Sequence, residues 1–357
     1  MRISILGAGH GGLAAAADLT LMGHEVKLSA VNKHDKNIQL LKAFKKIMIE
    51  GVTSKSSCPI EIPANFVCEN VEEAIKFAEI IMIIVPAFAQ DVYNDYILKY
   101  GKKGQIITYP CGGFSALNFN NKLKEYNRQD DFIVCETSSL IYTTKITAPC
   151  KILIKSIKDK VSFACANNEK TDYALEILNK IYPQYYKAQN AWQTSFNNPS
   201  SILHTITTLL NASRIELFGP YKNSFYDITP SIARIMEAVD EERIAIAKNF
   251  YSSPLTLNQI MCSLYSLDTD NIYETIKSIN AYKLQHSPDS LKHRYISEDI
   301  PYSLVPIATL GKILNLKTSN MDSIINIACM CNSENYWQTG RTAEKLGFNI
   351  KNNTVAA

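Results

Sequence analysis

The stretch ISILGAGHGG, Ile3 to Gly12, begins two residues into the chain and decides the expected fold. It holds four of the 14 glycines within six positions. Glycine loses more backbone freedom on folding than any other residue, so this cluster indicates a turn where bare backbone approaches something closely. Gly7, Gly9 and Gly12 form the pattern G-x-G-x-x-G between an apolar strand and an Ala- and Leu-rich helix.

The position of this pattern predicts a turn that binds the pyrophosphate of a dinucleotide. Gly7 would permit the tight turn, Gly9 would let backbone reach the phosphates, and Gly12 would let the helix pack on the sheet. The N-terminus of the helix would face the anion with N–H groups and a favourable dipole. His10 and Gly11 belong to the same turn. A glycine-rich turn without a ligand is the alternative.

Strand-like and helical segments alternate through the first half of the chain. This alternation predicts βαβ units and a parallel sheet, in an α/β Rossmann dinucleotide-binding domain over residues 1–187. The segment 47–67, punctuated by Pro59 and Pro63, is expected to be an edge hairpin or a loop. The expected strands are 2–6, 25–29, 79–85, 105–109 and 132–135, and the expected helices are 11–22, 71–78 and 90–99.

Beyond residue 188 the apolar residues recur with a period of 3.6, and strand-like alternation nearly vanishes. This predicts an all-α C-terminal domain over residues 188–357. Thr229-Pro230 and Ser303 are expected helix starts. The expected helices are 201–218, 230–250, 257–267, 271–279, 301–314 and 321–331.

Composition narrows the function classes. The net charge of +3 comes from 37 basic and 34 acidic residues without a long single-sign run, so neither nucleic acid nor a membrane surface is an expected partner. The nine cysteines are an odd number without CxxC spacing, and the chain shows no signal peptide and no long apolar run. These features indicate reduced thiols in the cytoplasm. No His/Cys cluster has ligand spacing, so no metal site is expected.

The end of the second expected strand bears on the choice of dinucleotide. NAD-binding chains usually place an acid there to hold the ribose hydroxyls. Here the strand runs into Ser29, Asn32 and Lys33, with no acid before residue 35. A small polar residue and a nearby cation suit a 2′-phosphate, which favours NADP over NAD without excluding NAD. Pro86 and Ala87, after the strand 79–85, are expected to line the nicotinamide or adenine pocket.

Two distant segments supply the candidate chemistry. His204 is a lone histidine on a helix with an apolar stripe, where a core or capping role is the usual one. Arg294 and Asp299 lie five residues apart, just before a helix expected near Tyr302. Helix capping is the alternative for Asp299 and its neighbour Glu298, and a surface ion pair is the alternative for Arg294.

Matching stretches spread through the chain resemble the opine dehydrogenase family, the NAD(P)-dependent octopine and nopaline dehydrogenases and their bacterial relatives. The resemblance implies an oxidoreductase of two domains that joins an α-keto acid, pyruvate or another small one, to the amino group of an amino acid. The stretches cover nearly the whole chain in order: ILGAGHGG, IIMIIVPAFAQ, ETSSLIYTTK, the His204 helix with LLNASRIE, ITPSIARIMEAVDEER, RYISEDIPYSLVPIATLG and GRTAEKLG.

The resemblance also implies roles for three residues. In that family a histidine on the first helix of the second domain pairs with an aspartate, and these positions fall on His204 and Asp299. The preceding arginine, which falls on Arg294, would contact a substrate carboxylate. The chemistry agrees, because hydride addition to C=N or C=O requires a proton donor and a carboxylate fixes the tautomer of an imidazole. Arginine binds carboxylates through its planar fork.

Several alternatives remain at this stage. A reductase of keto acids, of the ketopantoate reductase type, would share both domains, but no lysine stands in the constellation that such enzymes use. A non-catalytic dinucleotide sensor would keep the glycine turn alone. A homodimer through the helical domain is expected, and the role of the loop at Cys111 stays open. The charged residues Arg234, Glu237, Glu241 and Arg243 are expected on a solvated or interdomain salt-bridge face.

Overall fold

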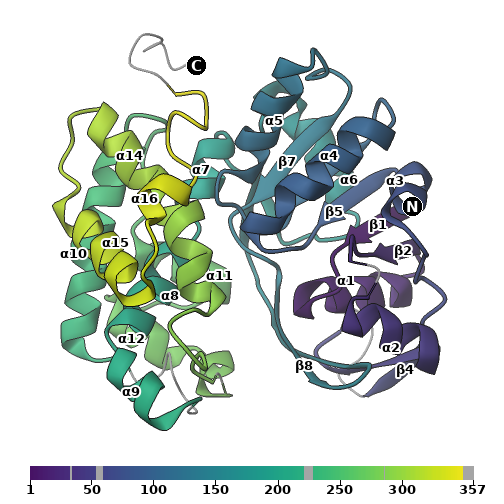
Figure 1. Cartoon of the computed structure of the whole chain (residues 1–357), viewed down its shortest axis with the longest axis horizontal. Coiled ribbons are helices and arrows are strands. Elements are labelled where there is room, and N and C mark those ends of the chain that lie inside the picture. Colours follow the sequence, from purple (N-terminus) through teal and green to yellow (C-terminus); the bar gives the residue numbers. More distant parts are fainter. Residues whose placement is uncertain (33, 54–58, 221–227, 285, 349–357) are drawn as a thin grey trace. The chain divides into compact units, whose positions relative to one another are not determined.

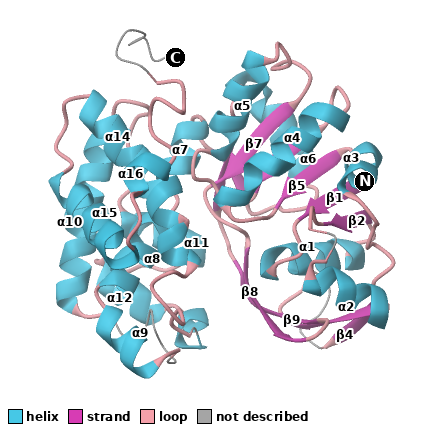
Figure 2. Cartoon of the chain, in the orientation of Figure 1, coloured by secondary structure: helices cyan, strands magenta, loops and turns pink. Residues whose placement is uncertain are grey.

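The computed structural model describes residues 1–348, apart from residues 33, 54–58, 221–227 and 285. The chain divides into two compact units, Met1–Lys187 and Ala188–Ala357. In the described residues every named strand belongs to the first unit, and the second unit is built from helices (Figure 2). The expected combination of a Rossmann domain and a helical domain is confirmed.

The first unit contains a main sheet of seven strands in the order β11-β10-β7-β6-β5-β1-β2. All neighbouring strands of this sheet pair in parallel, apart from β10 and β7, which pair antiparallel. The central strand β5 reads IIMI and is buried throughout, as a strand covered on both faces requires. The strands are β1 (Arg2–Leu6), β2 (Glu25–Ser29), β5 (Ile80–Ile83), β6 (Ile106–Tyr109), β7 (Ile133–Thr137), β10 (Val161–Cys165) and β11 (Tyr185–Lys187).

Helices cover this sheet. Apolar residues of α3, α4 and α5 join those of the central strands in one buried cluster, which includes Ile75, Ile97 and Phe119. The helical segments of the unit are α1 (His10–Leu21), α2 (Lys36–Phe44), α3 (Val71–Phe77), η1 (Ala87–Ala89), α4 (Gln90–Tyr100), α5 (Ser115–Glu125), η2 (Asn168–Lys170) and α6 (Thr171–Leu178).

A second sheet, in the order β4-β3-β9-β8, lies on the other side of α1 (Figure 1). β3 and β4 pair as an antiparallel hairpin, but β3 also pairs in parallel with β9, so the segment 47–67 is more than an edge. Because α1 is buried from Gly12 to Leu19, it packs against both sheets. The strands are β3 (Lys46–Gly51), β4 (Ile60–Pro63), β8 (Tyr142–Ala148) and β9 (Lys151–Ile157).

A buried polar contact fixes α1 against β8. The Tyr142 hydroxyl donates to Asp18 at 2.9 Å and lies 3.2 Å from the Tyr182 hydroxyl. Burial raises the pKa of Tyr182 well above its usual value, so this phenol stays protonated. The Asp18 carboxylate thus has a hydrogen-bond donor inside the core, as a buried acid needs.

The second unit surrounds helix α8 (Ser200–Leu209) with α10, α13, α15 and the turn η4. The expected helix 201–218 is interrupted, because α8 ends at Leu209 and α9 begins at Ala212. Thr229 caps α10 with Pro230 in the first turn, as expected. The other helical segments are α7 (Ala191–Phe196), α9 (Ala212–Phe218), α10 (Pro230–Ala247), α11 (Leu257–Tyr265), α12 (Ile272–Ser278), η3 (Asn280–Leu284), α13 (Arg294–Ser297), η4 (Ile300–Leu304), α14 (Val305–Ile313), α15 (Ser319–Asn332) and α16 (Tyr336–Thr339).

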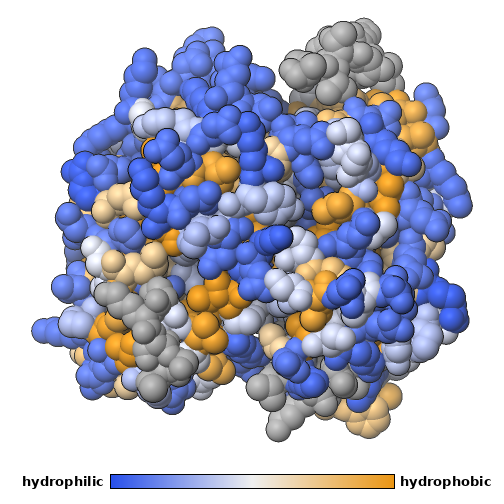
Figure 3. All heavy atoms as spheres, turned by 180° about the vertical axis from the view of Figure 1, so that it is seen from behind, coloured by the Kyte–Doolittle hydropathy of each residue, from blue (hydrophilic) through white to orange (hydrophobic). Residues whose placement is uncertain are grey.

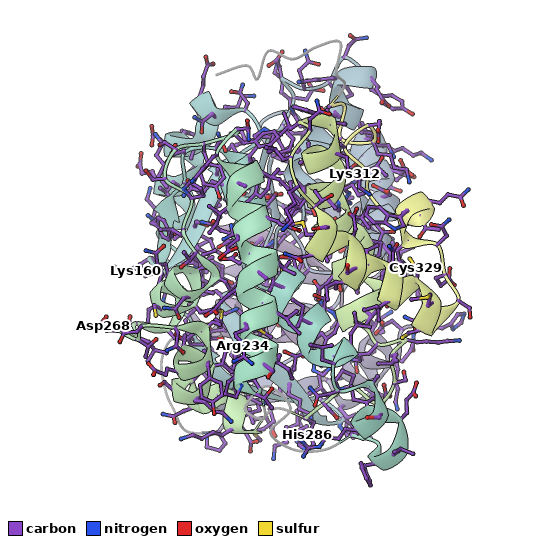
Figure 4. The ribbon with its side chains drawn as sticks, turned by 90° about the vertical axis from the view of Figure 1, so that its left-hand side faces the viewer. Lys160, Arg234, Asp268, His286, Lys312 and Cys329 are labelled. Carbon is purple, nitrogen blue, oxygen red and sulfur yellow. The ribbon has the colours of Figure 1, made fainter. Side chains whose placement is uncertain are left out.

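The expectation of a solvated or interdomain charged face on α10 is wrong for Arg243, whose side chain points into the core and is 1% exposed. Its Nε lies 2.6 Å from Asp240, and it donates to the carbonyls of Phe196 and Leu255 at 3.2 and 2.6 Å. These partners satisfy the buried charge and hold α7 and the segment before α11 against α10. The other three residues of that group are exposed: Arg234, labelled in Figure 4, Glu237 and Glu241.

The surface of the described residues is mixed. Figure 3 shows one face, where hydrophilic residues predominate and hydrophobic residues form smaller separate groups. Among the helices that the structure describes, none combines the length and the apolar character needed to cross a membrane.

Candidate active site

The turn between β1 and α1 is closed by contacts that only glycine permits. Gly7 has φ +119°, and a Cβ there would lie 2.4 Å from the Ile84 carbonyl oxygen. A Cβ on Gly12 would lie 1.9 Å from the Gly7 carbonyl oxygen, so the first turn of α1 sits directly on the loop. The Gly7 N–H donates to the Ser29 carbonyl at 2.9 Å, which joins the loop to the end of β2.

The same turn fits the pyrophosphate of a dinucleotide. A Cβ on Gly9 would meet nothing within 4 Å, so the space beside this backbone is open. Gly9 is the N-cap of α1, no side chain caps the helix there, and its first turn holds no acidic residue. An N-terminus of this kind presents N–H groups and the positive end of the helix dipole to an anion.

His10 and Gly11 connect this turn to the segments after β7 and along β8. The His10 Nδ1 accepts from the Ile146 N–H at 2.9 Å. A Cβ on Gly11 would lie 2.7 Å from a methyl group of Leu140, so the glycine lets the Leu140 side chain pack closely on the turn. The loop is held in turn by Lys158, whose ammonium donates to the Leu140 carbonyl at 2.7 Å.

The end of β2 opens on a cavity of about 380 Å³. Ser29, the last residue of β2, is buried. Asn32 accepts from the His34 N–H at 3.0 Å, and Lys33 lies outside the described residues. Asp35, the first acid after β2, accepts from two N–H groups at the start of α2 and is its N-cap. The cavity is lined by Ala30, His34, Ile38, Gln39, Lys42, Cys68, Glu69 and Asn70.

Pro86 and Ala87 lie just beyond the carboxyl end of β5, next to the glycine turn in the order of the sheet. Pro86 precedes the short turn η1, and its carbonyl accepts from the Ala89 N–H at 2.9 Å. Ala87 is buried. Carboxyl ends of parallel strands are where doubly wound sheets bind ligands, so both residues are placed to contact a nucleotide.

In the helical unit, the structure brings His204 and Asp299 together. The His204 Nδ1 lies 2.8 Å from Asp299 Oδ2. The Asp299 side chain is 7% exposed and that of His204 is 20% exposed, so solvent screens the pair little. A buried carboxylate beside Nδ1 selects the tautomer that carries its proton there.

Asp299 is available for this contact because of the local backbone. It precedes a π-helical turn, η4, and its side chain makes no capping hydrogen bond, so the capping alternative is not supported. The Val305 N–H donates to the Ile300 carbonyl, and the Pro301 carbonyl accepts from Arg341 at 2.8 Å. Since Pro306 has no N–H to continue a regular helix, a wide turn is accommodated here. The expected helix start at Ser303 is therefore wrong.

Arg294 lies on α13, on the same short segment as Asp299. Its Nε lies 2.8 Å from Glu298, one helical turn further on, and its side chain is 51% exposed. The guanidinium is thus oriented by a carboxylate through one edge, while half of its surface faces solvent. Such an arginine has donors suited to a carboxylate ligand.

Two further rings, those of Tyr295 and His293, lie near His204, and no sequence motif indicated them. The Tyr295 ring stacks on the His204 ring with 4.0 Å between centroids and 24° between planes. His293, the N-cap of α13, has its ring nearly perpendicular to the Tyr295 ring, with 4.5 Å between the centroids. Burial first, and then nearby Arg294 and His204, lower the pKa of His293 below its usual 6.5. Tyr295 and His293 lie a few residues before Asp299 in the sequence, and this proximity could have marked them as neighbours of the site.

Across the described ranges, no group of three or more His, Cys, Asp or Glu side chains is arranged to hold a metal ion. The cysteines that the structure describes are unpaired by disulfides.

Comparisons with known proteins found one family that matches the second half of the chain and relatives that match nearly all of it. The family described as NAD/NADP octopine/nopaline dehydrogenase, alpha-helical domain, matches residues 187–332. An opine dehydrogenase of Arthrobacter sp. (strain 1C) is 32% identical over 346 residues, which cover 97% of this chain and 94% of the relative.

Two solved structures share the fold. Octopine dehydrogenase in complex with NADH and agmatine superposes with a TM-score of 0.79 at 18% identity, covering 98% of this chain and 96% of that one. Yersinopine dehydrogenase with NADP⁺ bound superposes with a TM-score of 0.71 at 14% identity, again covering 98% of this chain and 96% of that one.

Proposed function

This chain belongs to the opine dehydrogenase family of NAD- and NADP-dependent oxidoreductases, and we propose that His204, Asp299 and Arg294 carry its chemistry. The reaction is the reductive condensation of an α-keto acid with the amino group of an amino acid, which gives a secondary amine. The observation that supports these roles most directly is the 2.8 Å contact between His204 Nδ1 and Asp299 Oδ2.

His204 acts as the general acid. Condensation of the amine with the keto group expels the carbonyl oxygen as water, and this oxygen needs a proton before it leaves. With Nδ1 turned to Asp299, the imidazolium donates that proton from Nε2. Asp299 holds the ring in this orientation by accepting from Nδ1.

Arg294 binds a substrate carboxylate. Its Nε edge lies against Glu298, which limits the directions in which the guanidinium can point. A planar fork of donors fixed in this way orients an α-keto acid better than a flexible ammonium would. We propose pyruvate or another small keto acid as the substrate.

The α/β unit, residues 1–187, binds the dinucleotide, and the helical unit, residues 188–357, carries the acid and the substrate contacts. When bound, the reduced nicotinamide supplies a hydride to the C=N carbon. The turn holds the pyrophosphate through Gly7, Gly9, His10, Gly11 and Gly12, the ribose faces Ser29 and Asn32, and Pro86 and Ala87 line the nucleotide pocket.

NADP is the preferred dinucleotide in this proposal, with NAD as the alternative. The first acid after β2, Asp35, caps α2 through one carboxylate oxygen, Oδ1. Lys42 lines the cavity at this strand end, where its ammonium also lies 3.0 Å from Glu69, and a cation at this place suits a 2′-phosphate. Turnover with NADPH and NADH at matched concentrations tests the preference, and faster use of NADH would reverse it.

The activity assay follows oxidation of NADPH or NADH with a panel of α-keto acids, each with and without amino acids. We expect oxidation that requires both partners, and a product whose mass corresponds to the secondary amine. Oxidation by a keto acid alone, with a hydroxy acid as product, would indicate a keto-acid reductase instead. Cofactor binding without any oxidation across the panel would indicate a sensor.

Two further expectations stay with the proposal. The cytoplasm suits the cysteine content, since its reducing conditions keep thiols free. A homodimer through the helical unit is expected, and the molar mass in solution, measured by light scattering, tests it against the 40.0 kDa of one chain.

A further inference from the structure

We propose that Tyr295 is a positioning residue that fixes the plane of the His204 ring, so that Nε2 faces one direction. The inference rests on the proposed function, because it takes His204 as the proton donor. It adds a residue to which neither the family match nor the catalytic pair assigns any role.

One hydrogen bond does not define the orientation of an imidazole. The contact from Nδ1 to Asp299 fixes one distance, but a coupled rotation about the two side-chain torsions, χ1 and χ2, can keep that distance and still tilt the ring. The face of Tyr295, 4.0 Å away and inclined by 24°, blocks this rotation. Two contacts in different directions, one at the edge and one on the face, therefore fix the plane.

Tyr295 is itself held in place. The Nδ1 of His293 accepts from the Tyr295 N–H at 3.3 Å, and the His293 ring lies against Tyr295 at an interplanar angle of 77°. Since burial keeps the pKa of His293 low, this ring stays neutral near neutral pH and preserves its acceptor. The segment 293–299 thus supplies the carboxylate, the stacked ring and the support for that ring.

Core packing does not account for Tyr295. It is half-buried, whereas the next residue, Ile296, is fully buried and supplies the core contact of α13. A stacked face is also the geometry in which an aromatic ring stabilises a neighbouring cation, so the contact persists when His204 is protonated.

The test compares substitutions at Tyr295. Tyr295→Phe keeps the flat face, and Tyr295→Leu removes it. Tyr295→Met, which fills a similar volume without a flat face, is a second non-aromatic variant in case the leucine variant does not fold. Tyr336→Leu is the matched control, because Tyr336 is a buried tyrosine of the same unit whose hydroxyl accepts from Asn332.

Two readouts are measured. The first is the ¹H NMR resonance of the His204 Nδ1–H in the unliganded protein, identified by its absence from the spectrum of His204→Ala. The second is kcat for reductive condensation, together with the KM for the cofactor. Loss of one aromatic contact predicts a fall in kcat of about 3- to 10-fold with an unchanged cofactor KM.

We expect the Nδ1–H resonance to persist in Tyr295→Phe and Tyr336→Leu, with kcat unchanged. In Tyr295→Leu and Tyr295→Met we expect the resonance to broaden through solvent exchange and kcat to fall. A sharp resonance or wild-type kcat in both non-aromatic variants would overturn the proposal. So would a phenylalanine variant that behaves like them, or a wild-type protein without the resonance. The NMR readout needs no turnover, so failure of the proposed reaction is recognised separately, by an inactive wild-type enzyme.

Discussion

At the scale of single residues, the site depends on a contact between side chains 95 positions apart. His204 lies within α8, and Asp299 precedes the π-helical turn that begins α14. The carboxylate is nearly buried, so its interaction with the imidazole is stronger than that of an exposed ion pair. A small change in either side chain should therefore alter the chemistry more than the fold.

Asp299→Asn tests the role of the carboxylate. The amide is of similar size but carries no charge and can present its NH₂ group to His204, so the tautomer without a proton on Nδ1 is favoured. We expect kcat to fall by about 10²-fold or more while the dinucleotide binds as before. Steady-state kinetics and fluorescence titration with NADPH measure the two effects. Wild-type kcat in a folded Asp299→Asn variant would contradict the role of the Asp299 carboxylate in orienting His204.

His293→Asn tests the buried histidine through pH. The folded protein holds the pKa of His293 below 6.5, so below pH 6.5 the unfolded chain binds more protons at this residue. The free energy of unfolding should therefore decrease as pH falls from 6.5 through the lowered pKa, and this component should disappear in the variant. Asparagine keeps an acceptor for the Tyr295 N–H.

The measurement is urea unfolding across that pH range, followed by tryptophan fluorescence. Both tryptophans of the chain, Trp192 and Trp337, lie in the helical unit, so the signal reports the unit that contains His293. Groups that do not interact with His293 contribute equally to both proteins, so the difference between the two slopes reports His293 together with its charged neighbours. An identical pH slope in wild type and variant would show that His293 titrates normally.

At the scale of elements, the glycines of the turn meet two different requirements. One is close packing of α1 on the loop, and the other is open space beside the backbone for a ligand. Gly12 is needed for packing, since a Cβ would overlap the Gly7 carbonyl, whereas Gly9 borders open space. The residue type alone does not distinguish these roles, because both positions are equally required by the motif.

Gly9→Ala and Gly12→Ala should therefore differ. Gly9→Ala should keep the thermal midpoint of the unliganded protein but weaken dinucleotide binding by about 10-fold or more, about 1.4 kcal/mol. Gly12→Ala should lower stability by about 1–3 kcal/mol even without ligand, because its Cβ forces the backbone apart. Differential scanning calorimetry with and without NADPH measures both. Equal stability losses in the two variants would contradict the distinction.

Elements differed in how well the sequence predicted them. The central strands could be predicted because they are apolar on both faces, and β2 matches its expected bounds, Glu25–Ser29. Strand β8, YTTKITA, is largely polar, so no apolar run marked it. Arg243 lies on the same buried face of α10 as Met236 and Val239, at helical spacing from both. This periodicity indicates a core position, but the charge of an arginine favours the opposite interpretation.

At the scale of the whole molecule, the two units carry different features. The α/β unit has the glycine turn at the N-terminus of α1 and a cavity at the end of β2, and the helical unit has the contact between His204 and Asp299. The division could be predicted from the change in periodicity near residue 188. The pairing of His204 with Asp299 depended on the family resemblance, and the stacking of Tyr295 could not be predicted because it depends on side-chain orientation.

The most direct test of this account is His204→Ala, measured for turnover and for dinucleotide binding in the same preparation. Since the glycine turn and His204 belong to different units, we predict an NADPH affinity within about twofold of wild type. Removal of the general acid predicts a kcat lower by about 10²- to 10⁴-fold with an α-keto acid and an amino acid as substrates. A folded variant that turns over at the wild-type rate would contradict the assignment of His204 as the proton donor.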